Sequence, residues 1–214
     1  MFLFKKATSK DKRIYLTFDD GPNPDATPGI LDVLDVFEIK AAFFLIGKNI
    51  KRYPEVVKDI HARGHLIGNH SHTHPMLFPF FSPELQIKQT QEVDDTLENL
   101  GIQQSRYFRP PNAICTQHTR GVFKQYNIVG VNHWICDNLI FSSRLIVSTL
   151  LKSIRFRGGG IIVLHDGAHS LISRTRKIIA TALNELIPRL LSQGYQFHRL
   201  DKATSSNVII KESA

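Results

Sequence analysis

The segment Arg13-Ile-Tyr-Leu-Thr-Phe-Asp-Asp-Gly-Pro22 joins a short apolar strand to two adjacent carboxylates and a turn. Residues 13–18 carry the apolar and β-branched side chains of a buried strand. The turn is built from Asp20-Gly-Pro-Asn-Pro24, and a helix is expected after it, with Thr27 as its N-cap and Pro28 at its first position. The segment therefore predicts a strand, a turn and a helix in that order, with charged groups at the end of the strand.

The same order of strand and helix recurs along the chain. Further strands are expected at residues 40–46, 65–69, 107–109, 128–134, 160–165 and 195–200. Helices are expected between them at residues 54–62, 82–100, 116–126, 142–155 and 173–193. This repeated alternation predicts an α/β fold with a parallel sheet, either open or closed into a barrel. Functional side chains of such folds gather at the carboxyl ends of the strands.

Length and composition are those of an ordinary globular protein. The chain has 214 residues, of which 42% are hydrophobic and 21% are charged, and these values exclude intrinsic disorder and collagen-like sequence. We expect one domain over residues 1–214, with its core at about residues 13–200. Cys115 and Cys136 are far apart in the sequence, so free thiols are expected rather than a disulfide framework.

The formal net charge of +8 is concentrated in the last third of the chain. Residues 1–139 hold 16 basic and 15 acidic groups, whereas residues 140–214 hold 11 basic and 4 acidic groups. No recognised nucleic-acid-binding motif accompanies this charge, so we expect it on solvated helix faces and expect no nucleic acid as a partner. Binding to nucleic acid through the basic third is the alternative, and it predicts an affinity that falls steeply with salt.

The sequence also predicts where in the cell the protein is found. The apolar start of Met1-Phe-Leu-Phe-Lys-Lys6 ends well short of the roughly 7–15 apolar residues of a signal peptide. Ala41-Ala-Phe-Phe-Leu-Ile46, among the longest later apolar runs, is shorter than the ~18 residues that a membrane helix needs. We therefore expect a cytoplasmic protein, or a secreted one only where a leader precedes this sequence. Any contact with a membrane would be peripheral.

Two adjacent carboxylates, Asp19 and Asp20, end the first expected strand. They repel each other, so burying both is unfavourable unless a cation or a proton resolves the conflict. One carboxylate can then bind a metal while its neighbour stays free as a base. The alternative is a structural pair that caps the turn before Gly21.

Histidines are concentrated in one part of the chain, because five of the ten lie between His61 and His74. His70 and His74 are four residues apart, so one helical turn would present both rings to the same ion. Together with either carboxylate of the first strand, they match a three-ligand catalytic zinc site. The histidines expected to lie away from such an ion are His61, His65 and His72.

Two more polar groups follow expected strands. Phe108-Arg-Pro-Pro-Asn112 places Arg109 at a strand end, where a guanidinium group can orient a carboxylate through two hydrogen bonds. Ile161-Ile-Val-Leu-His-Asp166 places His165 at the same edge, as suits a general acid near neutral pH. Each has a structural alternative when taken singly: a surface arginine in a proline loop, and a hydrogen-bonded core histidine.

In this order, the four clusters resemble those of the polysaccharide deacetylases, the NodB homology domain of carbohydrate esterase family four. The resemblance runs from about Arg13 to Leu200, and its most specific parts are Thr17-Phe-Asp-Asp-Gly21 and the histidine segment that ends at Pro75. It implies a distorted, incomplete (β/α)7 barrel with parallel strands. It also implies a metal-dependent hydrolase that removes N-acetyl groups from chitooligosaccharides or related amino-sugar glycans by cleaving a carbon–nitrogen bond.

The resemblance further implies a role for each residue of the site. The positions that match metal ligands are Asp20, His70 and His74. Zinc is the expected ion, with cobalt, nickel and manganese as alternatives. Asp19 matches the general base, Arg109 the arginine that steadies this base, and His165 the general acid. The backbone N–H of Asn112 is expected to bind the oxyanion.

Two motifs depart from the family pattern. Asn112-Ala113 stands where the third motif usually has Tyr-Gly, and Ile140-Phe141 stands where the fourth usually has Asp-Trp. The phenylalanine can line an acetyl pocket, but the isoleucine cannot pair with Arg109, so Asp137 is the candidate to replace it. An active enzyme is expected because the ligands and both proton-transfer residues are present. The alternative is a catalytically degenerate member that binds a glycan or a protein.

The apolar segment Met76-Leu-Phe-Pro-Phe-Phe81 directly follows the histidines. One interpretation is a plug of the core between the barrel and a helix. The other is a lip that contacts a sugar or a lipid. The second predicts that serine at Phe80 and Phe81 weakens substrate binding while the fold stays intact.

Overall fold

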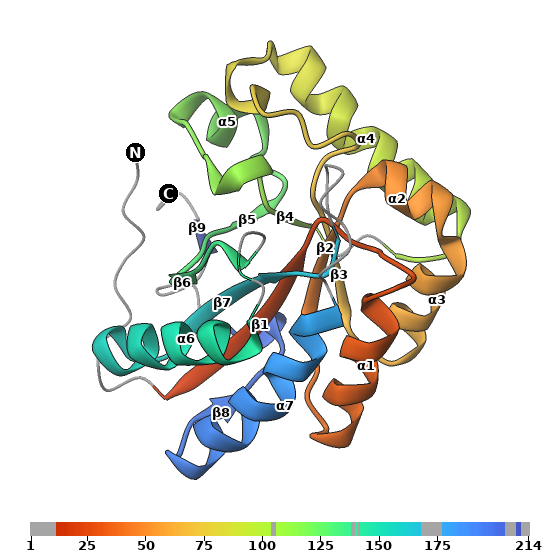
Figure 1. Ribbon diagram of the computed structural model, residues 1–214. Coiled ribbons are helices and arrows are strands. Elements are labelled where there is room, and N and C mark those ends of the chain that lie inside the picture. Colours follow the sequence, from red (N-terminus) through yellow and green to blue (C-terminus); the bar gives the residue numbers. More distant parts are fainter. Residues whose placement is uncertain are drawn as a thin grey trace.

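The computed structural model describes residues 12–103, 106–137, 140, 142–167, 177–203 and 209–210. They form a curled sheet in which seven parallel strands follow the order β6-β7-β1-β2-β3-β4-β5 (Figure 1). These strands are β1 (Arg13–Asp19), β2 (Ala42–Leu45), β3 (Leu66–Asn69), β4 (Tyr107–Phe108), β5 (Asn127–Val129), β6 (His133–Trp134) and β7 (Gly160–His165). A short β8 (Gln196–Phe197) pairs with the start of β1, and β9 (Ile209–Ile210) runs antiparallel to β5.

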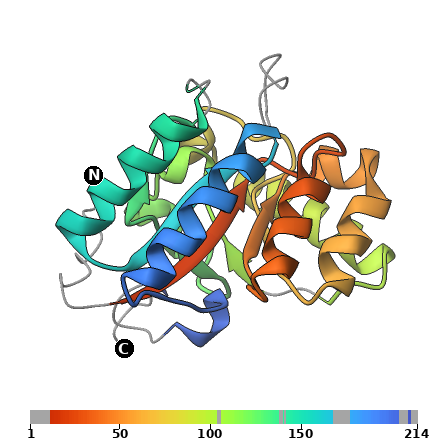
Figure 2. The same cartoon turned by 60° about the horizontal axis from the view of Figure 1, so that its bottom comes forward.

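Helices pack along the outside of this sheet, as Figure 2 shows for α1, α6 and α7. The α-helices in the described ranges are α1 (Thr27–Val36), α2 (Gly47–Arg52), α3 (Pro54–Ala62), α4 (Pro83–Asn99), α5 (Gln117–Val122), α6 (Ser143–Arg157) and α7 (Lys177–Ser192). The strand order confirms the expected distorted, incomplete (β/α)7 barrel. None of the helices in these ranges is both long enough and apolar enough to cross a lipid bilayer.

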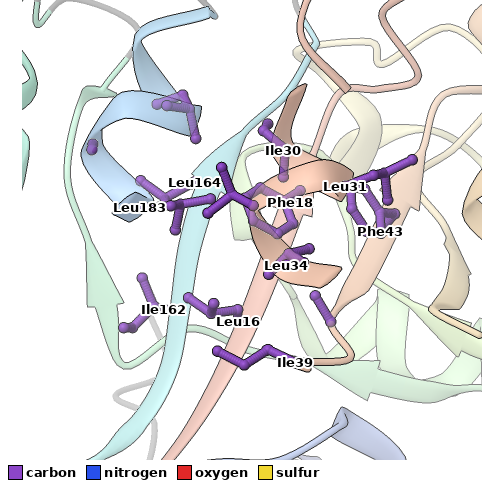
Figure 3. Close-up of a cluster of buried hydrophobic side chains, with 14 of the residues drawn as sticks. Leu16, Phe18, Ile30, Leu31, Leu34, Ile39, Phe43, Ile162, Leu164 and Leu183 are labelled. Atoms are coloured by element: carbon purple, nitrogen blue, oxygen red, sulfur yellow. The ribbon is translucent and has the colours of Figure 1, made fainter. Parts of the chain in front are cut away.

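The side chains of β1 alternate between the two faces of the sheet, as they must in an extended strand. Leu16 and Phe18 are buried against the helices, and Figure 3 shows them among residues of α1, β2, β7 and α7. Tyr15 belongs instead to a separate cluster on the other face, together with Ala42 and Phe44. The same alternation places Asp19 on the inner face of the curled sheet, at the carboxyl end of the strand.

The strand expected at residues 128–134 is wrong as one element. Two strands occupy this region, because β5 pairs with β4 while β6 pairs with β7, near opposite ends of the strand order. Gly130 lies between them, and the Asn132 side chain accepts a hydrogen bond of 2.8 Å from the backbone N–H of Ile161. The chain therefore leaves one side of the incomplete barrel and joins the other within a few residues.

Thr27 does not cap α1 as expected. Ala26 is the N-cap residue, and the Thr27 hydroxyl accepts a hydrogen bond of 2.9 Å from the Asn23 N–H. The same hydroxyl donates to Asp166 Oδ2 at 2.6 Å. Thr27 therefore ties the turn after β1 to the end of β7.

Candidate metal centre and active site

Asp19 and Asp20 separate at the end of β1 although they are adjacent in sequence. Asp19 is the last residue of the strand and is in register with His165 of β7. Asp20 has a φ of 70°, in the left-handed region that non-glycine residues seldom adopt. With this bend, Asp19 pairs with Arg109 while Asp20 faces His70 and His74, and His70 Nε2 lies within 4 Å of both carboxylates.

Asp20, His70 and His74 form a buried group of potential metal donors. Asp20 Oδ1 lies 3.5 Å from His70 Nε2 and 3.5 Å from His74 Nε2, and all three atoms lie within 4.8 Å of one another. Tetrahedral zinc with bonds of about 2.0–2.1 Å requires donor separations of roughly 3.4 Å. The spacing therefore fits a divalent ion at the centre of the group.

The electrostatics of Asp20 also fit a cation. Its Oδ1 is buried and has no hydrogen-bond partner among the described residues, an arrangement that costs about 1–3 kcal/mol unless an ion satisfies the oxygen. Burial alone would raise the pKa of Asp20, but the nearby imidazole rings of His70, His165 and His74 outweigh burial and hold this pKa well below its ordinary value. The carboxylate is therefore ionised and ready to act as a ligand.

The two histidines meet through a turn, so the expected single helical turn is wrong. Residues 70–74 follow β3 without helical structure, and Ser71 and His74 have φ values of 66° and 51°. The Asn69 side chain accepts from the Ser71 N–H at 2.9 Å, and the His74 N–H donates to Ser71 Oγ at 3.1 Å. Local hydrogen bonds thus hold the loop that carries both rings.

The orientation of the His70 ring is fixed from its far side. Nδ1 lies 2.7 Å from the carbonyl oxygen of Arg109, so the N–H is on Nδ1 and donates to this oxygen. Nε2, which faces Asp20, is then unprotonated. This is the usual arrangement of a metal-ligating histidine, in which an outer hydrogen bond sets the tautomer.

A polar network behind the histidine loop was not predicted. Asn69 Nδ2 donates to Asp94 Oδ1 at 2.9 Å, and the Tyr126 hydroxyl donates to Asp94 Oδ2. Asp94 lies on the buried face of α4, where Gln86, Thr90 and Asp94 follow one another at four-residue spacing. That run of polar residues on an otherwise apolar helix face was the available sequence signal.

Arg109 is fully buried and binds Asp19, as expected. Its Nη1 donates to Asp19 Oδ1 at 2.6 Å and to Thr17 Oγ1 at 2.9 Å, and its Nη2 donates to the Gly130 carbonyl at 3.2 Å. The guanidinium carbon also lies 4.2 Å from the centre of the Phe44 ring. These contacts fix Oδ1 of Asp19, while Oδ2 lies 3.8 Å from His70 Nε2.

Asp137 pairs with His165, so the expectation that it pairs with Arg109 is wrong. Asp137 Oδ1 lies 2.6 Å from His165 Nδ1, and its Oδ2 accepts from the His165 N–H at 3.1 Å. Asp137 follows β6, which is the neighbour of β7, whereas Arg109 is already occupied by Asp19. Burial lowers the pKa of His165, but Asp137, with Asp20 and Asp19, outweighs it and raises the pKa to about 9.

None of the described positions that depart from the family pattern belongs to the group of candidate metal donors. Asn112 is exposed, with a φ of 57°, in the short turn that follows β4. Ile140 packs against the main hydrophobic cluster. Phe141 lies outside the described residues.

Each of the two interpretations of the apolar segment Met76–Phe81 fits a different part of it. Phe78 is fully buried and packs against Phe108 and Phe123, which makes it part of the core. Met76, Leu77 and Phe80 are exposed. The exposed residues are the ones available to contact a substrate.

The remaining histidines of the cluster lie away from the metal donors, as expected. His72 Nε2 lies 3.2 Å from Glu92 Oε2 of α4, and His61 is exposed on α3. His65 is buried beside β2, where its Nδ1 accepts from the Ala41 N–H at 3.1 Å. Only His70 and His74 therefore join Asp20 among the described residues.

The whole arrangement suits hydrolysis of an amide. Asp19 and His165 lie on adjacent strands beside the candidate metal donors. Asp19 has an oriented carboxylate, and His165 is held protonated near neutral pH. Two titratable groups in such different environments can serve as the base and the acid of one reaction.

Comparisons with known proteins agree with this chemistry. A family model described as polysaccharide deacetylase matches residues 6–131. A chitooligosaccharide deacetylase of Rhizobium leguminosarum bv. trifolii is 34% identical, and the match covers 92% of this chain and 94% of that protein. The peptidoglycan-N-acetylmuramic acid deacetylase PdaA of Bacillus subtilis is 31% identical, over 92% of this chain and 73% of its own length. The crystal structure of the Bc1960 peptidoglycan N-acetylglucosamine deacetylase superposes with a TM-score of 0.76 at 30% identity, covering 90% of this chain and 88% of that one.

Proposed function

This chain belongs to the polysaccharide deacetylase family, and we propose that its substrate is a chitooligosaccharide or a closely related oligomer of N-acetylated amino sugars. It is a metal-dependent hydrolase that removes N-acetyl groups from an N-acetylated sugar. The choice of chitooligosaccharide is supported by similarity to the rhizobial enzyme over nearly the whole of both chains. The observation that carries the reaction is the division of two adjacent carboxylates, with Asp19 bound to an arginine and Asp20 facing two histidines.

We propose that Asp20, His70 and His74 hold a zinc ion. Their buried position, their spacing and the set tautomer of His70 support this choice. A divalent ion held by these residues would polarise the acetyl carbonyl and would bring the pKa of a bound water toward about 7. Cobalt, nickel and manganese accept similar donors and are the alternatives that metal analysis distinguishes.

We propose that Asp19 is the general base. Arg109 binds its Oδ1, so Oδ2, near His70 Nε2, is the oxygen placed to accept the proton of the attacking water. The Asn112 N–H, in the turn after β4, is proposed as the hydrogen-bond donor to the oxyanion.

His165 is proposed as the general acid. Its Nδ1–H donates to Asp137, so Nε2 carries the proton that can be transferred. An amine is a poor leaving group until it is protonated, and a raised pKa keeps this imidazole charged at neutral pH. A degenerate, purely glycan-binding protein is not favoured, because the candidate ligands and both proton-transfer groups lie together.

Acetate release from a panel of substrates tests this function. N-acetylglucosamine oligomers, peptidoglycan fragments and free N-acetylglucosamine are incubated with the zinc-loaded chain, and mass spectrometry identifies the deacetylated product. We expect release from the chitin oligomers, and a loss of about 10²–10⁴-fold in Asp19→Asn with unchanged zinc content. Release of acetate from the peptidoglycan fragments alone would contradict the proposed chitooligosaccharide substrate. If the chain released no acetate from any substrate and bound no stoichiometric metal, the proposed enzymatic activity would be contradicted.

A further inference from the structure

The outer face of α6 combines exposed basic and apolar side chains. Its buried residues lie on one side and are Ile146, Val147, Leu150 and Ile154. At about 100° per residue, the opposite side carries Arg144, Lys152 and Arg155 together with Leu145 and Phe156. Phe156 is 82% exposed and Leu145 is 52% exposed, so this face is not a purely polar one.

The charged side chains of this face are all basic. The sequence of α6 contains four basic residues and no Asp or Glu. Within the described part of the chain, Arg144, Lys152 and Arg155 form no ion pair, and Glu185 of the neighbouring α7 is paired with Arg189 at 2.7 Å. This helix therefore presents a free positive surface that belongs to the basic last third of the sequence.

The fold explains only part of this composition. Basic residues in the last turn, Arg155 and Arg157, interact favourably with the helix dipole. The dipole does not explain cations in the earlier turns, nor does it explain an aromatic ring left in water. By contrast, α4 also exposes apolar side chains, Leu85 and Ile87, but it carries five acidic residues and one lysine.

We propose that the outer face of α6 docks on an anionic lipid bilayer. Arg144, Lys152 and Arg155 contact the headgroups, and Phe156 and Leu145 enter the boundary with the acyl chains. Such interfaces favour a basic helix face that also carries large apolar side chains, and each cation adds about a fivefold gain in affinity. A polyanion such as DNA would use the cations and leave Phe156 without a role.

The position of α6 is compatible with catalysis on the docked protein. In Figure 1 the helix lies on the opposite side of the molecule from α2 and α3. It connects the end of β6 to the start of β7, so its axis runs along the side of the barrel. Contact through the outer face of α6 leaves the carboxyl ends of the strands, where the candidate metal donors lie, open to substrate.

Sedimentation with vesicles tests the proposal on the full chain. Phosphatidylcholine vesicles are compared with vesicles that also contain phosphatidylglycerol, at low and high salt. We expect binding to the anionic vesicles only, weakened by salt, and reduced at least tenfold in Lys152→Glu/Arg155→Glu. Phe156→Ser is expected to reduce binding several-fold while the salt dependence stays. Acetate release from a soluble chitin oligomer is expected to be unchanged in all of these variants.

Lys88→Glu and Leu85→Ser on α4 are the matched controls, and both are expected to bind vesicles like the unchanged chain. Vesicle binding that is absent at low salt, or that is unaffected by the α6 variants, would overturn the proposal. Double-stranded DNA is the competing probe: binding to DNA as tight as to vesicles, with no effect of Phe156→Ser on either, would assign the face to nucleic acid instead.

Discussion

The long strands and the short strands of this barrel contribute differently to the site. β1 and β7 are paired from Ile14 and Gly160 to Asp19 and His165, and their ends supply the proposed base and acid. β4, β5 and β6 are only two or three residues long, yet they lead into Arg109, Gly130 and Asp137. The reacting groups thus extend from the long strands, and the groups that orient them come from the short ones.

This difference indicates how the two regions respond to substitution. A change at the long strands or the histidine loop should remove the reaction. A change at the short strands should alter pH dependence, metal affinity or substrate binding while the chemistry survives. The departures from the family pattern, at Asn112-Ala113 and Ile140-Phe141, all follow short strands.

The largest effect is predicted for His74→Ala. Loss of one of three ligands should remove the metal, and activity should fall on the order of 10³-fold or more, because the ion supplies several kcal/mol of transition-state stabilisation. His72→Ala is the control, since this neighbour pairs with Glu92 instead. Metal analysis and acetate release are measured on both. Full metal content in His74→Ala would contradict the proposed role of His74 as a metal ligand.

Asp137→Asn is predicted to shift the pH profile. The proposed acid must be protonated to act, and its pKa of about 9 keeps it so up to mildly alkaline pH. Removing the Asp137 charge lowers this pKa, so the alkaline limb of kcat/KM should move down by about 1–3 pH units, with about tenfold less activity per unit on that side. Metal content should not change. A profile that superimposes on that of the unchanged chain would refute the tuning role.

Tyr126→Phe is predicted to weaken metal binding by about tenfold, the lower end of the effect of outer partners on a metal site. The change removes the hydroxyl that donates to Asp94 and so loosens the support of Asn69 before the histidine loop. A competitive zinc titration measures the effect, with Tyr53→Phe beside α3 as the control. Equal affinity in both variants would show that the network serves the fold alone.

The smallest effect is predicted for Phe80→Ser. Loss of one partly buried apolar contact with a sugar, worth about 1 kcal/mol, should raise KM about fivefold and leave the melting temperature unchanged. Phe78→Ser two residues earlier should instead destabilise the fold by about 3–5 kcal/mol, because this ring is fully buried. If both variants change stability alone, the exposed part of the segment does not contact substrate.

Much of the fold follows from local sequence patterns. Alternation of apolar strands and helices predicted the parallel barrel, and Ser82 before Pro83 correctly placed the start of α4, where its side chain accepts from the Leu85 N–H. The division of residues 128–134 into two strands could not be predicted from the local sequence. It depends on which distant strands, β4 and β7, offer free edges on either side of Gly130.

The candidate site shows the same limit. Residue types predicted Asp20, His70 and His74 as candidate ligands, and the structure brings them together, but their four-residue spacing suggested a helix where left-handed residues build a turn. The pairing of Asp137 with His165 depends on β6 lying beside β7, a long-range fact of topology. Side-chain chemistry was therefore predictable, whereas partner choice required the three-dimensional arrangement.

Arg109 contacts both the proposed base and a proposed metal ligand, the first through its side chain and the second through its backbone. Its guanidinium group holds Asp19, and its own carbonyl oxygen accepts the hydrogen bond that sets the ring of His70. The separation of these two anchoring points is limited by the covalent bonds of a single side chain. A displacement of the chain at Arg109 would therefore be transmitted to the proposed base and to a proposed metal ligand at the same time.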